Sequence, residues 1–265
     1  MRIALGIEYD GTNYHGWQQQ DGSLITLQST IESSISKVAN HPIKIICAGR
    51  TDVGVHASSQ VIHFDTDSKR RLDAWVLGTN SYLPKDICIK WAMDVPKDFH
   101  ARHSATARRY KYIIYNQKIR PAILANKVSW HFKPLDIQSM HLAGQHLLGE
   151  QDFSSFRSSS CQSNTPMRNI HHLNVTKHGH LIIIDIKANA FLQHMVRNIA
   201  GLLITIGEGK YHPVWAKEVL EKRDRREAAH TAEACGLYFI EVCYPTIYQF
   251  PQSANFSFFD ISILF

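Results

Sequence analysis

The sequence has no pair of cysteines spaced for a thiolate metal site or a disulfide framework. Its five cysteines are an odd number with no C-x-x-C pair among them, which fits neither kind of site. No window approaches the roughly 18–20 uninterrupted apolar residues that cross a bilayer. The N-terminal stretch MRIALGIEYDG runs directly into charge and a glycine turn, unlike a signal peptide. We therefore expect a cytoplasmic protein with no membrane span.

The composition describes an ordinary globular protein with a basic surplus. At 265 residues the chain can form two modest domains. Hydrophobic residues make up 44% and charged residues 20%, as in folded proteins generally. The formal net charge is +6 and the pI is near 9.0, which favours a polyanionic partner. A basic protein without such a partner remains the alternative.

Hydrophobic periodicity and turn residues predict the same order of elements twice along the chain. The first half has predicted strands at 3–9, 43–47, 60–65 and 87–93, with helices at 26–40 and 69–79. The second half has predicted strands at 107–116, 169–177, 181–188 and 237–243, with helices at 136–148, at 191–207 and from 213 onward. Both halves follow the β-α-β-β-α-β order of the split βαβ unit.

We therefore predict an α+β fold of two ferredoxin-like or RRM-like βαββαβ domains, with mainly antiparallel sheets that meet at a central cleft. The expected domains are residues 1–104, which carry a polar loop around Asp52, and residues 105–245. Residues 246–265 form an aromatic-rich tail with five phenylalanines. The same unit occurs in single-stranded-RNA readers, but their RNP1 pattern is absent here, so the fold alone predicts no RNA binding.

The stretch CAGRTDVGVHA at 47–57 is the strongest candidate for a reactive site. It follows a β-branched run and carries one carboxylate, Asp52, between Gly49 and Gly54. A glycine-edged turn after a strand commonly holds a reactive side chain at the mouth of a cleft. A carboxylate there can act as a nucleophile or as a base. The alternative is an aspartate that only hydrogen-bonds its own turn.

Arg197 is the best candidate for a cation that keeps Asp52 ionised. It shares a predicted helix face with Ala190, His194 and Gly201, and small residues beside it allow another element to approach closely. A nearby cation lowers the pKa of a carboxylate by about 1–3 units, and a buried arginine needs an anionic partner. An arginine that points into solvent would have the same spacing.

The stretch 108–112, RRYKY, is the densest mixture of basic and aromatic residues. On a strand, Tyr110 would project beside guanidinium groups, an arrangement suited to base stacking next to phosphate contacts. An exposed strand with cross-strand pairs would look the same. Arg50 can hold a phosphate or fill the gap left by a displaced base. The histidines at 171, 172, 178 and 180 alternate between strand faces without thiolate or acidic neighbours, so we predict no metal site.

Five segments of the chain resemble the A-type tRNA pseudouridine synthases. They are EYDGTNYHGWQ at 8–18, CAGRTDVGVHA at 47–57, FHARHSATARRYKYIIYN at 99–116, IKANAFLQHMVRNIAG at 186–201 and GLYF at 236–239. Position 53 is Val where the family usually has Ala. The tail after residue 245 matches no segment of the family.

The resemblance implies a cofactor-free isomerase that detaches uracil from its ribose and reattaches it through carbon. It makes Asp52 the catalytic residue, Arg197 its partner, Tyr110 the residue that stacks on the target base, Arg50 an aid to base flipping and Leu237 part of the pocket wall. The implied substrate is uridine at positions thirty-eight to forty of the tRNA anticodon stem-loop, bound by a homodimer. The implied RNA contacts are Ser58, Arg70, Phe99, His100, Ala101, Arg102, His103, Lys118, Ser160, Cys161, Gln162, Ser163 and Asn164.

Two other functions remain as alternatives. A non-catalytic RNA-binding module would use the basic strand and the fold alone. A carboxylate nuclease or glycosidase would use Glu8 and Asp10 together with Asp52.

Overall fold

The computed structural model describes residues 1–19 and 24–251, and the chain divides into two compact units. The first unit contains Met1–Thr106 and the chain from Phe239 onward, and the second contains Ala107–Tyr238. The pattern of elements predicts that the second domain extends to residue 245, whereas in the structure most of the last strand, β10 (Leu237–Cys243), belongs to the first unit. The carbonyl of Cys243 accepts hydrogen bonds from the backbone N–H and the hydroxyl of Thr106, which ties the returning chain to the end of the first segment. Residues 252–265 of the predicted tail lie outside the described residues.

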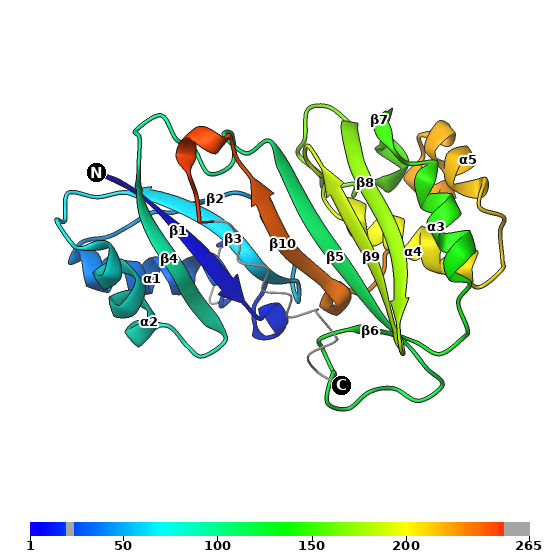
Figure 1. The fold of residues 1–265 in the computed structure, drawn as a ribbon, viewed down its shortest axis with the longest axis horizontal. Coiled ribbons are helices and arrows are strands. Elements are labelled where there is room, and N and C mark those ends of the chain that lie inside the picture. The colour runs from blue at the N-terminus through cyan, green and yellow to red at the C-terminus, as the bar shows by residue number, and fades with distance from the viewer. Residues whose placement is uncertain (20–23, 252–265) are drawn as a thin grey trace. The chain divides into compact units, whose positions relative to one another are not determined.

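The first unit is built on an antiparallel sheet. Its strands are β1 (Arg2–Tyr9), β2 (Ile46–Cys47), β3 (His56–Asp65) and β4 (Ile87–Val95) (Figure 1). β1 is central and pairs with β3 and β4, while β2 pairs with β3. β10 lies next to β3 on its other side, so the order is β4-β1-β3-β10.

Helix α1 (Leu27–Ala39) of the first unit begins and ends where the sequence predicts. Thr26 accepts a hydrogen bond from the backbone of Ser29, and Asn40 ends the helix in the left-handed conformation. Leu27, Ile31 and Ile35 are fully buried, as their helical spacing predicts. The second predicted helix is a π-helical segment, Ala74–Gly78, followed directly by α2 (Thr79–Tyr82).

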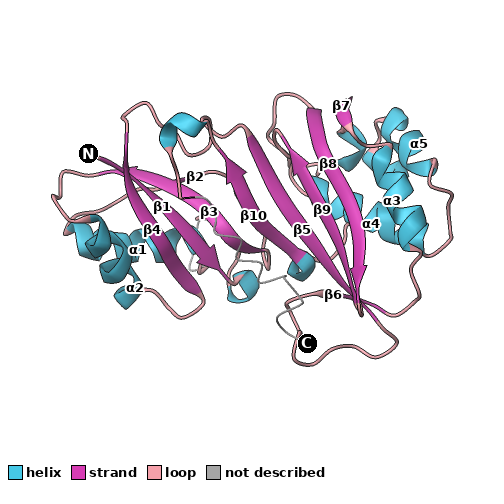
Figure 2. Cartoon of the chain, in the orientation of Figure 1, coloured by secondary structure: helices cyan, strands magenta, loops and turns pink. Residues whose placement is uncertain are grey.

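The second unit has its own antiparallel strands in the order β5-β9-β8-β7. They are β5 (Ala107–Asn116), β7 (Gly149–Asp152), β8 (Met167–His178) and β9 (Leu181–Ala188), and the short β6 (Ser129–His131) adds a parallel pairing to β5. β8 and β9 are joined at Gly179, which has φ = +56°. Strands predominate over helices in this α+β protein (Figure 2).

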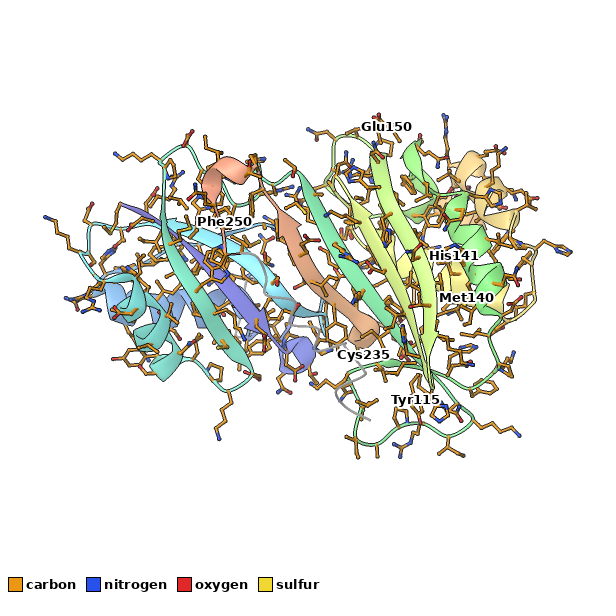
Figure 3. All side chains as sticks on the ribbon, viewed as in Figure 1. Tyr115, Met140, His141, Glu150, Cys235 and Phe250 are labelled. Carbon is orange, nitrogen blue, oxygen red and sulfur yellow. The ribbon has the colours of Figure 1, made fainter. Side chains whose placement is uncertain are left out.

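Three helices complete the second unit: α3 (Ile137–Gln145), α4 (Met195–Gly207) and α5 (Trp215–Lys222). Met140 on α3 is fully buried (Figure 3). A Cβ on Gly207 would lie 2.8 Å from the Met140 side chain, so glycine at this position of α4 allows the two helices to pack closely. Among the described residues, no helix combines the length and the apolar character needed to cross a bilayer.

Every residue of helix α4 is buried except Arg197, which is half-buried. The sequence predicted a helix from residue 191, but the helix begins at Met195, because His194 has φ = +63° and cannot continue it. The predicted close approach beside Arg197 is present. A Cβ on Gly201 would lie 1.9 Å from the carbonyl oxygen of His230, so only glycine allows this contact.

Candidate active site

Asp52 opens a tight turn between β2 and β3. The N–H of Val55 donates to the carbonyl of Asp52 over 3.2 Å, and Gly54 has φ = +78°, a value that glycine adopts without strain. Asp52 is half-buried, whereas Val53 at the tip of the turn is 54% exposed. Position 53, where the family usually has Ala, is therefore one of the more exposed positions of the turn.

The backbone on the N-terminal side of Asp52 is fixed by residues from the first family-like segment. The Tyr9 phenol lies 2.8 Å from the hydroxyl of buried Thr51, and the N–H of Trp17 donates to the Thr51 carbonyl over 3.0 Å. Gly16 has φ = +79°, and a Cβ there would lie 3.1 Å from the Thr51 carbonyl. The EYDGTNYHGW segment thus supports the turn that carries the carboxylate.

Gln60 fixes the start of the same loop. Its buried side-chain amide donates to the carbonyl of Gly49 over 2.6 Å and accepts from the Gly49 N–H over 3.3 Å. A two-bond contact of this kind defines both position and orientation of the backbone. The loop is therefore held at both ends by buried polar side chains.

His56 and Asp10 stabilise the C-terminal end of the loop. The Nδ1 atom of buried His56 accepts from the N–H of Gly11 over 3.2 Å and lies 3.0 Å from a carboxylate oxygen of Asp10. Asp10 also accepts from the backbone and the hydroxyl of Thr12. A Cβ on Gly11 would lie 2.0 Å from the carbonyl oxygen of Val55, so this glycine permits the contact between the two segments.

The two carboxylates of the nuclease or glycosidase alternative are both engaged elsewhere. Asp10 caps the short 3₁₀ turn Gly11–Asn13, and Glu8 lies 3.2 Å from the ammonium group of Lys90. Within the described part of the chain, no group of three or more His, Cys, Asp or Glu side chains is arranged to hold a metal ion. These positions give Glu8 and Asp10 structural partners rather than a shared reactive site.

Of the other predicted catalytic and substrate residues, Arg50 is exposed in the same loop as Asp52, and Tyr110, Arg197 and Leu237 lie in the second unit. Tyr110 on β5 is 8% exposed and packs edge-to-face against Phe191, with ring centroids 5.1 Å apart. The next residue to the N-terminal side, Arg109, forms a two-bond ion pair with Asp185 on the neighbouring strand, at 2.7 and 2.6 Å. Arg109 therefore forms a cross-strand pair, which was the alternative to an RNA contact for the basic stretch 108–112. Leu237 at the start of β10 is buried.

Arg197 is fixed by a mutual contact with Ala232. Its Nε atom donates to the Ala232 carbonyl over 2.8 Å, and its own carbonyl accepts from the Ala232 N–H over 3.1 Å. The close approach at Gly201 brings this segment against α4. The side chain of Arg197 thus has a defined direction before any substrate is bound.

The segment at 99–103 contains both buried and exposed residues. Phe99 and Ala101 are fully buried, whereas Arg102 and His103 are exposed. Phe99 belongs to an aromatic cluster whose members include Tyr244, Tyr248 and Phe250 (Figure 3). Of the residues predicted to contact RNA in this segment, Phe99 and Ala101 therefore have no side chain at the surface.

Two buried or half-buried histidines shape this segment. The N–H of Ala101 donates to Nδ1 of His63 over 3.1 Å, and the N–H groups of Arg102 and His103 both donate to Nδ1 of His100 over 3.2 Å. Burial lowers the pKa of His63 to about 4 and also lowers the pKa of His100. Both rings act as neutral acceptors that hold the backbone.

The remaining predicted RNA contacts lie at the surface or near it. In the segment at 160–164, the Cys161 carbonyl accepts from Arg157 over 2.6 Å, and the Ser163 hydroxyl accepts from Arg168 over 2.6 Å. Arg70 is exposed and donates to the carbonyl of Val38 at the end of α1. The other predicted contacts are half-buried at Ser58 and exposed at Lys118, Ser160, Gln162 and Asn164.

The fold and the loop define an α+β protein that presents one carboxylate on a turn held by buried side chains. A family model described as tRNA pseudouridine synthase matches residues 6–104 and 143–245. The chain is 59% identical over 246 residues to tRNA pseudouridine synthase A of Legionella pneumophila (strain Lens), covering 92% of this chain and 93% of that protein. It is 56% identical over 254 residues to tRNA pseudouridine synthase A of Vibrio vulnificus (strain YJ016), covering 96% of each.

Among solved structures, one chain titled as part of a Cbf5-Nop10-Gar1 complex aligns with a TM-score of 0.34 and 10% identity, over 89% of this chain and 57% of that chain. This likeness is too distant to describe the fold. The sequence matches extend over most of the chain, and the chain belongs to the tRNA pseudouridine synthase family, whose members are isomerases.

Proposed function

We propose that this chain converts uridine to pseudouridine at positions thirty-eight to forty of the tRNA anticodon stem-loop, with Asp52 as the catalytic residue on a flipped-out uridine. The observation that carries the proposal is the turn at Asp52. Its backbone is fixed by Tyr9, Trp17 and Gln60, while Asp52 itself is half-buried at the start of the turn. A reactive group held in this way loses little freedom when the substrate binds.

The proposed reaction needs no cofactor. The N1–C1′ glycosidic bond breaks, the uracil turns, and a C5–C1′ bond forms as the proton on C5 leaves and N1 becomes protonated. Asp52 serves this sequence as a nucleophile or as a base, and both roles require the ionised carboxylate. In either role of Asp52 the reaction releases the hydrogen of C5, so tritium placed at C5 reports turnover.

The proposal assigns supporting roles to four further residues. Tyr110 stacks on the everted base, Arg50 assists flipping from the exposed flank of the loop, and Leu237 lines the pocket. Arg197 pairs with Asp52, and the Ala232 contact that fixes its guanidinium supports this role. Extruding a base from its stack costs a few kcal/mol, and stacking on an aromatic ring offsets about 1–3 kcal/mol of it.

Exposed and half-buried polar residues supply the proposed tRNA contacts. Of the segment at 99–103, His100, Arg102 and His103 are the side chains that RNA can reach. The segment at 160–164 and the separate residues Ser58, Arg70 and Lys118 complete the surface. We also propose that the two units are ferredoxin-like duplicates whose sheets meet at a cleft, and that the enzyme is a cytoplasmic homodimer.

The test is the Asp52→Ala variant with tRNA that carries tritium at uracil C5. We expect tritium release to fall to background while tRNA binding stays within about threefold of wild type, because one carboxylate contributes little to phosphate binding. The matched control is Asp94→Asn, at an exposed carboxylate on β4, which should retain turnover. Tritium release that survives Asp52→Ala would overturn the assignment.

The same assay separates the alternatives. A non-catalytic RNA-binding module gives no tritium release with wild-type protein. A nuclease shortens the RNA, and a glycosidase releases free uracil, whereas the proposed isomerase does neither.

A further inference from the structure

A cavity of about 620 Å³ opens in the second unit, apart from every residue assigned to the uridine site. Three segments line it: the chain around the 3₁₀ turn Ser154–Phe156, the start of α4, and the stretch that follows α5. Its volume lies within the roughly 300–1,000 Å³ typical of ligand sites. It is larger than a bare ion requires.

The lining is basic. Arg157, Arg225, Arg226 and His194 contribute to it, and none of the described residues that line it is an aspartate or a glutamate. A concave surface with one sign of charge concentrates the opposite charge. The cavity therefore favours an anion.

Arg225 contributes a positive charge that none of the hydrogen-bond partners named next neutralises. Its guanidinium donates hydrogen bonds to neutral oxygens, namely the carbonyls of Ala228 and Ala229 and the side chains of Asn198 and Thr231. Burial lowers the pKa of its guanidinium, which nevertheless stays charged near neutral pH. A half-buried cation with neutral partners is stabilised when an anion enters beside it.

The cavity wall is formed before any ligand binds. Fully buried Asn198 donates to the carbonyl of Phe156 over 2.7 Å and accepts from the hydroxyl of Thr231 over 2.7 Å. One side chain thus ties together the three lining segments. A rigid wall lowers the entropic cost of binding.

The remaining lining points to a ribose-phosphate group rather than a base. Ser154, Ser158 and Ser159 contribute hydroxyl donors, and within the described part of the chain no aliphatic, Phe, Tyr or Trp side chain lines the cavity. A base-binding site uses an aromatic platform for stacking, whereas phosphate contacts come from arginine and hydroxyl groups. The lining matches the second kind of contact.

The cavity adjoins residues of the proposed tRNA surface. The N–H of Ser158 donates to the carbonyl of Gln193, and the hydroxyl of Ser160 donates to its side chain. Asn198 and Thr231 are the direct neighbours in sequence of Arg197 and Ala232, which hold each other. A ligand in the cavity therefore contacts the same framework that orients Arg197.

We propose that this cavity binds a phosphodiester group of the tRNA backbone, at a subsite separate from the uridine pocket. This inference rests on the proposed function, because it takes tRNA as the substrate. The subsite reads no base and positions the tRNA through its backbone. Its loss weakens the binding of different tRNA sequences to a similar extent.

The first experiment places a negative charge at Ser159, which is exposed and lines the cavity. We expect Ser159→Glu to bind a tRNA transcript about tenfold more weakly than Ser159→Gln, equivalent to 1.4 kcal/mol, because both variants lose the hydroxyl and have nearly equal size, so that they differ in charge. Gln138→Glu on α3 adds the same charge to the same unit away from the cavity and should bind like wild type. Equal affinities for Ser159→Glu and Ser159→Gln would overturn the inference.

The second experiment removes one positive charge. Arg226 is 88% exposed and pairs with Asp224 at 2.6 Å, and Lys222, outside the lining, pairs with Glu227 at the same distance. We expect Arg226→Gln to lower the slope of log Kd against log salt by about 0.9, the value for one phosphate contact, and Lys222→Gln to leave it unchanged. The inference is wrong if the two variants have the same slope.

Wild-type protein is assayed in parallel for tritium release and titrated with inorganic phosphate. If wild type binds tRNA but forms no pseudouridine, the proposed function fails and the cavity result still stands on its own. If phosphate binds at the cavity while all variants bind tRNA equally, the site takes a free anion and the tRNA inference is rejected.

Discussion

Tyr9 and Thr51 are joined by a buried hydrogen bond of 2.8 Å between their hydroxyl oxygens. Tyr9 ends the central strand of the first sheet, and Thr51 directly precedes Asp52. The bond therefore transfers the rigidity of β1 to the turn that carries the carboxylate. A reacting group displaced by about 1 Å can lose roughly a hundredfold in rate, so this contact has consequences for turnover as well as stability.

Replacing Tyr9 with Phe tests that link. The change removes one buried hydrogen bond and leaves the Thr51 hydroxyl without this partner, so the free energy of unfolding should fall by about 1–2 kcal/mol. We expect kcat to fall about three- to tenfold while KM for tRNA stays close to wild type. Urea unfolding and the tritium-release assay measure the two effects. Tyr82→Phe, at a 52% exposed tyrosine, is the control and should alter neither quantity.

Gly201→Ala tests how Arg197 is positioned. The added Cβ would lie 1.9 Å from the His230 carbonyl, so the chain at 230–232 has to move away from α4, at a cost of about 1–3 kcal/mol. Because Ala232 holds the guanidinium, we expect kcat to fall at least tenfold in protein that remains folded. Gly78→Ala, where the nearest side-chain atom is 3.3 Å away, should keep wild-type turnover. Equal kcat values for the two variants would contradict this role for Gly201.

The buried histidine His63 makes stability depend on pH. Burial lowers its pKa to about 4 in the folded protein, against about 6.5 in an unfolded chain. The unfolded chain therefore binds a proton first as the pH falls, so stability is complete above about pH 6.5 and is lost progressively toward pH 4. We expect the urea midpoint to be lower at about pH 5 than at about pH 7.5.

The His63→Asn variant separates the contribution of His63 to the pH dependence of stability from that of the acidic groups. The Asn side-chain oxygen can accept the Ala101 N–H without titrating. The difference in urea midpoint between the two pH values should be smaller in this variant. An unchanged difference would assign the pH dependence to other groups.

Variants of two arginines, Arg102 and Arg109, can distinguish a predicted RNA contact from a structural ion pair. Arg102 is exposed in the segment at 99–103, whereas Arg109 is held by Asp185. We expect Arg102→Gln to weaken tRNA binding and to lower the salt slope by about 0.9. Arg109→Gln should leave the slope unchanged and reduce stability by about 0.5–1 kcal/mol. A filter-binding series at several salt concentrations measures both slopes.

Much of the fold was predictable because its elements have strong local patterns. β5, β9 and β10 have the predicted bounds, and α1 with its two caps spans the predicted residues 26–40. Two strands were missed. β7 is the polar run GEQD at a sheet edge, and β6 has three residues, so neither carries the alternation from which strands are recognised. The predicted strand at 43–47 is reduced to Ile46–Cys47.

The site was predictable only in part. Asp52 and Arg197 stand out from glycine spacing and helix periodicity, and the resemblance to a family assigns their roles. Tyr9, Gln60 and His56 were missed, because their importance comes from tertiary contacts with Thr51, Gly49 and Gly11. Their position inside or beside the family-like segments was the available signal, and it carries no information on what each side chain touches.

The chain leaves the first unit after Thr106 and returns to it at Phe239. β2 covers only two residues of the β3 edge that faces away from β1, so the rest of that edge stays unpaired until β10 has been synthesised, after the entire second unit. An unpaired strand edge invites association with other chains. During translation, this half of the enzyme therefore depends on prompt folding of the segment inserted within it, and a variant that slows that folding should aggregate through a region it does not touch.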